Sequence, residues 1–137
     1  MASHAAGKQV AEFNLKITSV RLSDGPGGCT VLEVNVEGSA RDSAGTFGTA
    51  QIVEGGIFGT LTVVGSPKGG TFRYLARAHL DNGTAFDGTD TGTYELVDGF
   101  VYHTTGVLNL PDGRRFVSDG RCDVAARSWT GKIFAIA

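Results

Sequence analysis

The sequence predicts an all-β fold, an antiparallel up-and-down barrel of eight or nine strands with a central cavity. Apolar and polar residues alternate with the period of two that half-buried strands show, and Asn-Gly and Asp-Gly turn sequences separate successive runs. No segment keeps the i, i+3, i+4 apolar pattern of a helix for three turns. Sequential hairpins favour a meander, and a sheet of this size closes to remove its edges. A barrel is therefore expected, with a two-sheet β-sandwich as the alternative.

The chain of 137 residues fits a single domain, which we expect over residues 9–137 after a disordered tail at residues 1–8. Its net charge is −2 and its 12 Lys and Arg are scattered, so we expect no nucleic-acid partner. The first residues lack the basic start and apolar core of a secretory signal, and no apolar run approaches the roughly 20 residues of a spanning helix. We therefore expect a cytoplasmic protein with no membrane partner, in which Cys29 and Cys122 are free thiols.

Two strands are expected at the start of the chain. In the first, Val10–Leu22, apolar residues alternate with polar ones until the phase slips at Ser19, which predicts a β-bulge or a bend. The glycine-rich loop of residues 23–28 separates it from the second run, Cys29–Glu37, which has the alternation of a half-buried strand.

Weaker alternation covers residues 46–54 and 57–64, and we expect Gly55-Gly56 to separate these two runs into different strands. The pattern is clean again from Thr71 to Leu80.

Four further runs occupy residues 84–136, divided by turn sequences such as Val97-Asp98-Gly99 and Pro111-Asp112-Gly113. Every second residue of a strand lies on the same face, and in each run one face carries aromatic side chains together with glycines in the middle of the strand. A glycine inside a strand weakens it, so its recurrence predicts sharp bends where the sheet coils into a small barrel. These glycines are Gly88, Gly92, Gly106, Gly120 and Gly131.

The same parity predicts which side chains face the interior and could contact a ligand. An eight-stranded barrel is just wide enough for one small ligand, and a ligand cavity combines apolar walls with a few hydrogen-bonding groups. The candidate substrate-binding residues are Phe72, Tyr74, Phe86, Thr104, Phe116, Ser118, Cys122 and Trp129. The alternative is a packed core in which the hydroxyl groups bond to the backbone.

Asp90 is the strongest candidate for catalysis, together with Tyr94 and Tyr102. If Asp90 lies inside the barrel, burial should raise its pKa and suit it to general acid–base chemistry, while the tyrosines would orient a substrate or stabilise negative charge. The simpler interpretation, which we favour from sequence, is that residues 87–92 form an irregular, solvated segment in which Asp90 caps a bulge.

Cofactors and metals are not expected. No two histidines have a metal-ligand spacing, the two cysteines are too few for a zinc site, and no nucleotide-binding or nucleophile-elbow motif occurs. A homo-oligomer is expected, because Val101, Val107 and Val117 fall on the outer face and residues 133–136 are apolar on both faces.

Two short segments resemble known barrels. Gly92-Thr-Tyr-Glu95 and Ser128-Trp-Thr-Gly131 resemble pieces of avidin-type strands, and the glycine-broken, turn-linked strands resemble the calycin-like barrels of allene oxide cyclase and dirigent proteins. The chain departs from lipocalins, whose Gly-x-Trp stands in the first strand, and it lacks the several tryptophans of a biotin site. The resemblance implies a cofactor-free reaction in an apolar barrel and assigns no catalytic residue.

Three functions follow as hypotheses. The first is a cofactor-independent isomerase, cyclase or lyase that acts on a small hydrophobic or aromatic metabolite. The second is a non-catalytic carrier of a small apolar ligand. The third is a carbohydrate-binding or assembly module of the sandwich type, in which Tyr74, Tyr94 and Trp129 would be exposed.

Overall fold

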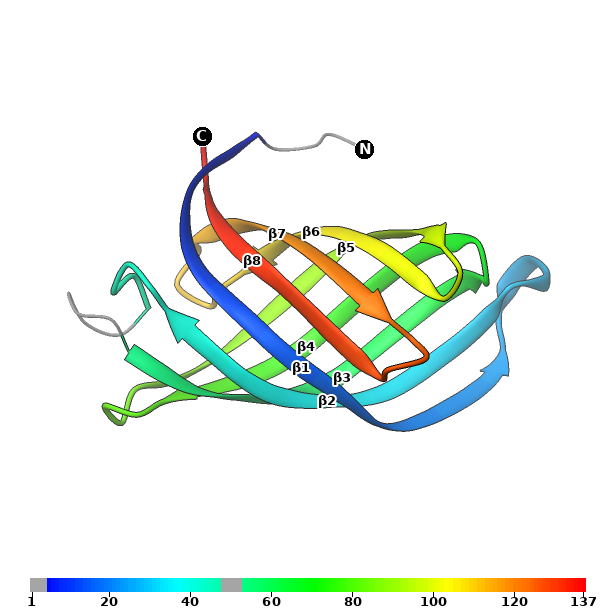
Figure 1. The fold of residues 1–137 in the computed structure, drawn as a ribbon, viewed down its shortest axis with the longest axis horizontal. Helices are drawn as coiled ribbons and strands as arrows, with labels where there is room; N and C mark the ends of the chain where they lie inside the picture. The colour runs from blue at the N-terminus through cyan, green and yellow to red at the C-terminus, as the bar shows by residue number, and fades with distance from the viewer. Residues whose placement is uncertain (1–4, 48–52) are drawn as a thin grey trace.

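The computed structural model describes residues 5–47 and 53–137 and shows a closed barrel of eight antiparallel strands (Figure 1). Each strand pairs with the next one in the chain, and β8 pairs with β1 to close the barrel. The strands are β1 (Ala6–Asp24), β2 (Thr30–Asp42), β3 (Val53–Ser66), β4 (Gly69–Leu80), β5 (Ala85–Asp98), β6 (Val101–Asn109), β7 (Arg115–Asp123) and β8 (Ser128–Ile136). The predicted up-and-down barrel is confirmed, and the sandwich alternative is wrong because all the strands belong to one closed sheet.

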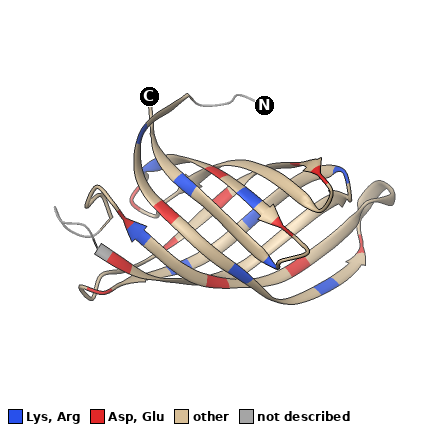
Figure 2. Ribbon diagram, viewed as in Figure 1, with Lys and Arg blue, Asp and Glu red and all other residues tan. Residues whose placement is uncertain are grey.

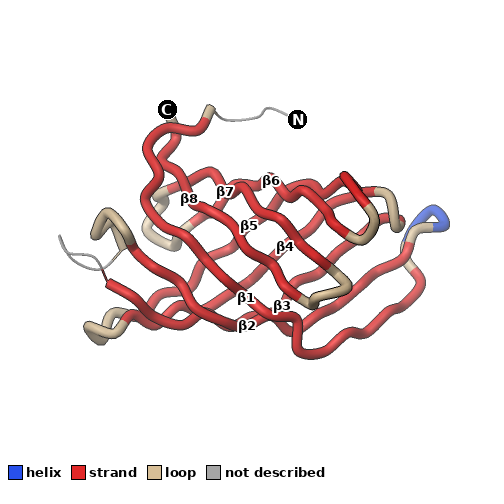
Figure 3. Tube along the Cα trace, viewed as in Figure 1, coloured by secondary structure: helices blue, strands red, loops and turns tan. Residues whose placement is uncertain are grey.

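Helical structure is limited, in the part of the chain that the structure describes, to the short 3₁₀ turn η1 (Pro26–Gly28) in the β1–β2 connection (Figure 3). No helix among these residues is long and apolar enough to cross a membrane. Acidic and basic residues are interspersed over the strands (Figure 2).

The barrel has two ends, which differ in their connections. We call one the hairpin end: it carries the β1–β2, β3–β4, β5–β6 and β7–β8 connections. The other, the terminus end, carries the remaining connections and both chain termini, where Ala6 of β1 pairs with Ile136 of β8 (Figure 1). Strand β1 thus begins within the segment that was expected to form the tail. The register of β1 against β2 shifts between Ile17 and Ser19, which confirms the predicted bulge.

Strand β3 corrects one expectation. Gly55 and Gly56 do not end a strand; they lie inside β3 and pair with Ala40 and Ser39 of β2. A Cβ atom on Gly55 would meet the carbonyl oxygen of His79 on β4, so this glycine permits close strand approach rather than a turn. The expected strand over residues 46–54 falls largely on residues 48–52, which lie outside the described residues.

Glycines also allow close approach in the second half of the barrel. Gly92 of β5 and Gly106 of β6 face each other in register. A Cβ atom on Gly92 would meet the backbone of Thr105 and Gly106, which fits the expectation that glycines mark places where the sheet coils tightly.

The outer face carries a short apolar row across three strands. Val107, Val117 and Phe134 pair in register across β6, β7 and β8, and Val117 is 9% exposed although it points away from the interior. Homo-oligomerisation stays a prediction.

Candidate functional site

The interior of the barrel is divided by Trp129. Its ring lies edge-on to those of Phe13, Phe72 and Tyr74, with centroid distances of 5.3, 5.7 and 5.3 Å, and its Nε1–H donates a 3.0 Å hydrogen bond to the Thr104 hydroxyl. The indole is 2% exposed. A large cavity lies on its hairpin-end side and a small cavity on its terminus-end side, and Trp129 lines both.

Trp129 can occupy this position because the neighbouring strand β7 has a glycine, Gly120, beside it. A Cβ atom on Gly120 of β7 would lie 2.8 Å from the indole Nε1 and 2.7 Å from the Thr104 hydroxyl. The Tyr74 hydroxyl donates to the carbonyl of Val36 at 2.9 Å, which fixes the neighbouring ring, and burial raises the pKa of Tyr74, as does the charge of Glu37 to a smaller extent. These contacts make the partition a rigid layer with satisfied polar groups.

The large cavity has a volume of about 460 Å³ and receives side chains from all eight strands. Its wall is almost entirely apolar. The aliphatic and aromatic residues in it are Ile17, Val20, Leu22, Leu32, Val34, Leu61, Val63, Phe72, Val124 and Trp129. At its mouth Val20, Leu22 and Val124 are 48%, 65% and 42% exposed, so the entrance itself is apolar.

Tyr94 and Tyr102 line the large cavity with their hydroxyl groups already engaged. Tyr94 donates to the carbonyl of Ser66 at 2.9 Å and Tyr102 to that of Pro67 at 2.5 Å, so both hold the β3–β4 turn over the mouth. Their rings meet edge to face at 5.7 Å. The pKa of Tyr94 is raised, first by burial and then by the nearby Tyr102 and Cys29.

Cys122 also lines the large cavity, and both it and Cys29 are free thiols, as predicted. Burial raises the pKa of Cys122 to about 11, with a smaller contribution from Asp123, so the group is a protonated thiol at neutral pH and a poor nucleophile. Arg127 lies at the mouth, in the β7–β8 connection.

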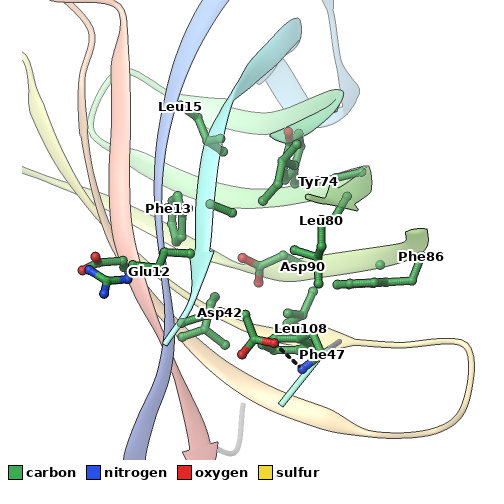
Figure 4. A pocket seen from close by; sticks show the side chains of 18 of the residues that line it. Glu12, Phe13, Leu15, Asp42, Phe47, Tyr74, Leu80, Phe86, Asp90 and Leu108 are labelled. Atoms are coloured by element: carbon green, nitrogen blue, oxygen red, sulfur yellow. Dashed lines mark hydrogen bonds between the residues drawn. The ribbon is translucent and has the colours of Figure 1, made fainter. Parts of the chain in front are cut away.

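The small cavity, of about 100 Å³, is lined mainly by apolar side chains and contains Asp90 (Figure 4). Asp90 is 5% exposed, and its Oδ1 accepts a 2.9 Å hydrogen bond from the Ser118 hydroxyl. Burial raises the pKa of Asp90 to about 6, while the hydrogen bond from Ser118 acts in the opposite direction. The carboxyl group therefore changes charge just below neutral pH.

The position of Asp90 corrects the interpretation that we favoured from sequence. Residues 87–92 are part of the regular strand β5, and Asp90 pairs with Tyr74 and Leu108 in register. The carboxylate fits because Gly106 faces it: a Cβ atom on that glycine would collide with the Asp90 carboxylate and lie 3.0 Å from the Phe72 ring. Asp90 is thus an interior residue and caps no bulge.

Phe47 and Asp42 complete the terminus end of the small cavity, and neither was singled out from the sequence. Asp42 is 2% exposed and accepts hydrogen bonds from the backbone N–H groups of Thr46 and Phe47, at 2.8 and 2.7 Å (Figure 4). These bonds hold the Phe47 ring 5.6 Å from Phe86 and 4.9 Å from Phe116. An Asp that precedes a Ser-Ala-Gly turn is a known backbone acceptor, and that signal could have identified Asp42.

The structure separates the predicted site residues into two groups. Phe72, Thr104 and Cys122 line the large cavity with Tyr94 and Tyr102. Tyr74, Phe86 and Asp90 line the small one. Phe116 and Ser118 stand behind the small cavity, where they contact Phe47 and Asp90. The three candidate catalytic residues, Asp90, Tyr94 and Tyr102, therefore do not converge on a common cavity.

Residues 5–47 and 53–137 contain no group of three or more His, Cys, Asp or Glu side chains that could hold a metal ion. Comparisons of the chain with protein-family models, curated proteins and solved structures found no match. The resemblance to calycin-like barrels therefore stays a prediction, and function has to be argued from the two cavities.

Proposed function

We propose that this protein binds a small apolar molecule in the large cavity and acts as a carrier or sequestering protein. The observation that carries this proposal is the cavity itself, about 460 Å³ of mostly apolar wall at one end of a closed barrel. Ligand pockets have volumes of roughly 300–1,000 Å³ and walls of this kind. A molecule that fills the cavity would also cover the exposed side chains of Val20 and Leu22 at the mouth.

Three hydroxyl groups in the wall of the large cavity are already hydrogen-bonded within the protein, which favours an apolar ligand. The hydroxyl groups of Tyr94 and Tyr102 donate to backbone carbonyls, and the Thr104 hydroxyl accepts from Trp129. A ligand with several polar groups would lose its own hydration without gaining these partners, whereas an apolar ligand exchanges water for dispersion contacts. Binding free energy would therefore come from buried apolar area.

The isomerase, cyclase or lyase hypothesis stays a prediction with a specific requirement. A substrate in contact with Tyr94 would have to reach Asp90 across the Trp129 layer, because these residues line different cavities. The carrier hypothesis needs no such contact, and for this reason we prefer it.

Titration with N-phenyl-1-naphthylamine, a neutral apolar dye, tests the carrier proposal. Trp129 is the single tryptophan of the chain and lines the cavity, so energy transfer from it to the dye reports occupancy. Val63→Phe adds volume to the cavity wall and should weaken binding about tenfold, or ~1.4 kcal/mol. Thr60→Phe, at an exposed position on the same strand, is the matched control and should bind as the wild type does.

Alkylation of Cys122 provides an independent measurement of occupancy. Bound dye should slow the reaction of Cys122 with iodoacetamide, since the thiol lines the same cavity; the reaction is followed at about pH 9.5, where part of this thiol with a pKa of about 11 is ionised. Equal dye affinity in Val63→Phe and the wild type, with Cys122 unprotected, would show that the dye binds elsewhere and would overturn the proposal.

A further inference from the structure

Asp90 is a buried carboxylate with an unused acceptor. Its Oδ1 accepts from Ser118 at 2.9 Å, but no described residue donates to its Oδ2, and no Lys, Arg or His among them forms an ion pair with it. A buried carboxylate is ordinarily paired or hydrogen-bonded through both oxygens. Figure 4 shows the Asp90 carboxylate directed from β5 into the small cavity.

The buried polar groups around the small cavity do not donate to this oxygen. The Tyr74 hydroxyl donates to Val36, the Trp129 Nε1–H donates to Thr104, and Asp42 is itself an acceptor, bound to two backbone N–H groups. The described donors of Tyr74 and Trp129 are therefore used, which leaves Oδ2 of Asp90 without a donor, while the charged side chains of Glu12 and Arg41 lie at the exposed edge of the cavity.

We propose that the small cavity binds the ammonium group of a compact aliphatic amine, with one N–H donating to Oδ2 of Asp90. The carboxylate supplies the counter-charge, and the aromatic side chains of Tyr74, Phe86 and Trp129 line the same space. The face of an aromatic ring stabilises a cation within about 6 Å of the ring centroid, so a ring that presents its face to the ammonium would add to the selection for positive charge. A neutral alcohol would satisfy the hydrogen bond and leave the charge unpaired.

The size of the small cavity limits the amine. A cavity of about 150 Å³ holds one benzene molecule, so the ~100 Å³ here fits a ligand of about four non-hydrogen atoms. The alkyl part would pack against apolar side chains such as Ile57 and Leu108. Two exposed residues of the lining, Glu12 and Arg41, mark where the cavity reaches the surface.

This site is separate from the one proposed above, because Trp129 stands between the two cavities. Failure of the dye to bind the large cavity would leave the amine proposal standing, and the reverse also holds.

NMR titration of the ¹⁵N-labelled protein at pH 7.5 with propylammonium and with 1-propanol tests the proposal. The two ligands have the same size and differ in charge. The wild type should bind the ammonium at least about tenfold more tightly, as a charged hydrogen bond implies, with shifts in the amides around Asp90. Equal affinities for the two ligands would overturn the proposal without the need for any variant.

Variants then locate the charge that selects the amine. Asp90→Asn keeps the shape of the side chain and should abolish the preference for ammonium over alcohol. Asp98→Asn removes an exposed carboxylate at the far end of the same strand and should leave the preference unchanged. Retention of the preference in Asp90→Asn would show that the Asp90 carboxylate does not bind the ammonium, and loss of the preference in Glu12→Gln would place the ammonium at the edge of the cavity beside Glu12; either result would refute the inference.

Discussion

Substituting Asn for Asp90 should change how folding stability depends on pH. The pKa of this carboxyl is about 6 in the folded chain against an ordinary value of 3.8, and the difference corresponds to about 3 kcal/mol. The folded state holds the proton more tightly than the unfolded state does. Stability is therefore lost as pH rises from about 4 to about 6, and the loss is complete above that range. The amide side chain of the Asp90→Asn variant has no charge and escapes this loss.

Urea unfolding at pH 4.0 and pH 7.5, followed by Trp129 fluorescence, measures this effect. The free energy of unfolding of Asp90→Asn relative to the wild type should rise between the two pH values by about 3 kcal/mol at most. The amide oxygen can accept from Ser118, and any cost of the unpaired N–H₂ group is the same at both pH values and cancels. Asp98→Asn should show no such change, since that carboxylate is exposed. A pH-independent difference for Asp90→Asn would refute the burial argument.

Two further predictions concern the Trp129 layer and the space around Asp90. Thr104→Val removes the acceptor of the Trp129 Nε1–H, which should lower the free energy of unfolding by about 1–3 kcal/mol. Thr105→Val, on the outer face, should have little effect, and thermal unfolding followed by circular dichroism distinguishes the two variants. Gly106→Ala introduces a Cβ atom against the Asp90 carboxylate and should lower the free energy of unfolding by about 1–3 kcal/mol in the same assay. The Cβ atom of Gly56→Ala would meet only a carbonyl oxygen at 3.6 Å, so equal losses of unfolding free energy in the two variants would contradict close packing at Gly106.

Much of the barrel could be predicted from local sequence patterns. The period-two alternation and the Asp-Gly turns give the strands, and parity alone puts Asp90, Tyr94 and Tyr102 on the inner face, where the structure has them. The continuity of β3 through Gly55 and Gly56 could not be obtained in this way, because Gly55 is required by the close approach of β4 and not by a turn. A local pattern does not distinguish these two uses of glycine.

The division of the interior could not be predicted because it depends on contacts between strands that are distant in sequence. Trp129 is placed by its register against Cys122 on β7 and held by Thr104 on β6. The alternation pattern of β8 predicts which face of the strand carries Trp129, but not how far the indole extends across the interior of the barrel. Without that information, all the inner-face residues are assigned to one site.

Trp129 determines how the two cavities relate to each other. Its indole N–H is bonded to Thr104, and three aromatic rings surround it, so movement of the ring would break a buried hydrogen bond and open a void. The cavities also differ in chemistry: the large one offers an apolar wall in which the hydroxyl groups of Tyr94 and Tyr102 are engaged, and the small one has a free oxygen of the Asp90 carboxylate in its buried part. A rigid layer between two such spaces favours two independent sites with different ligands over a single site that extends through the barrel.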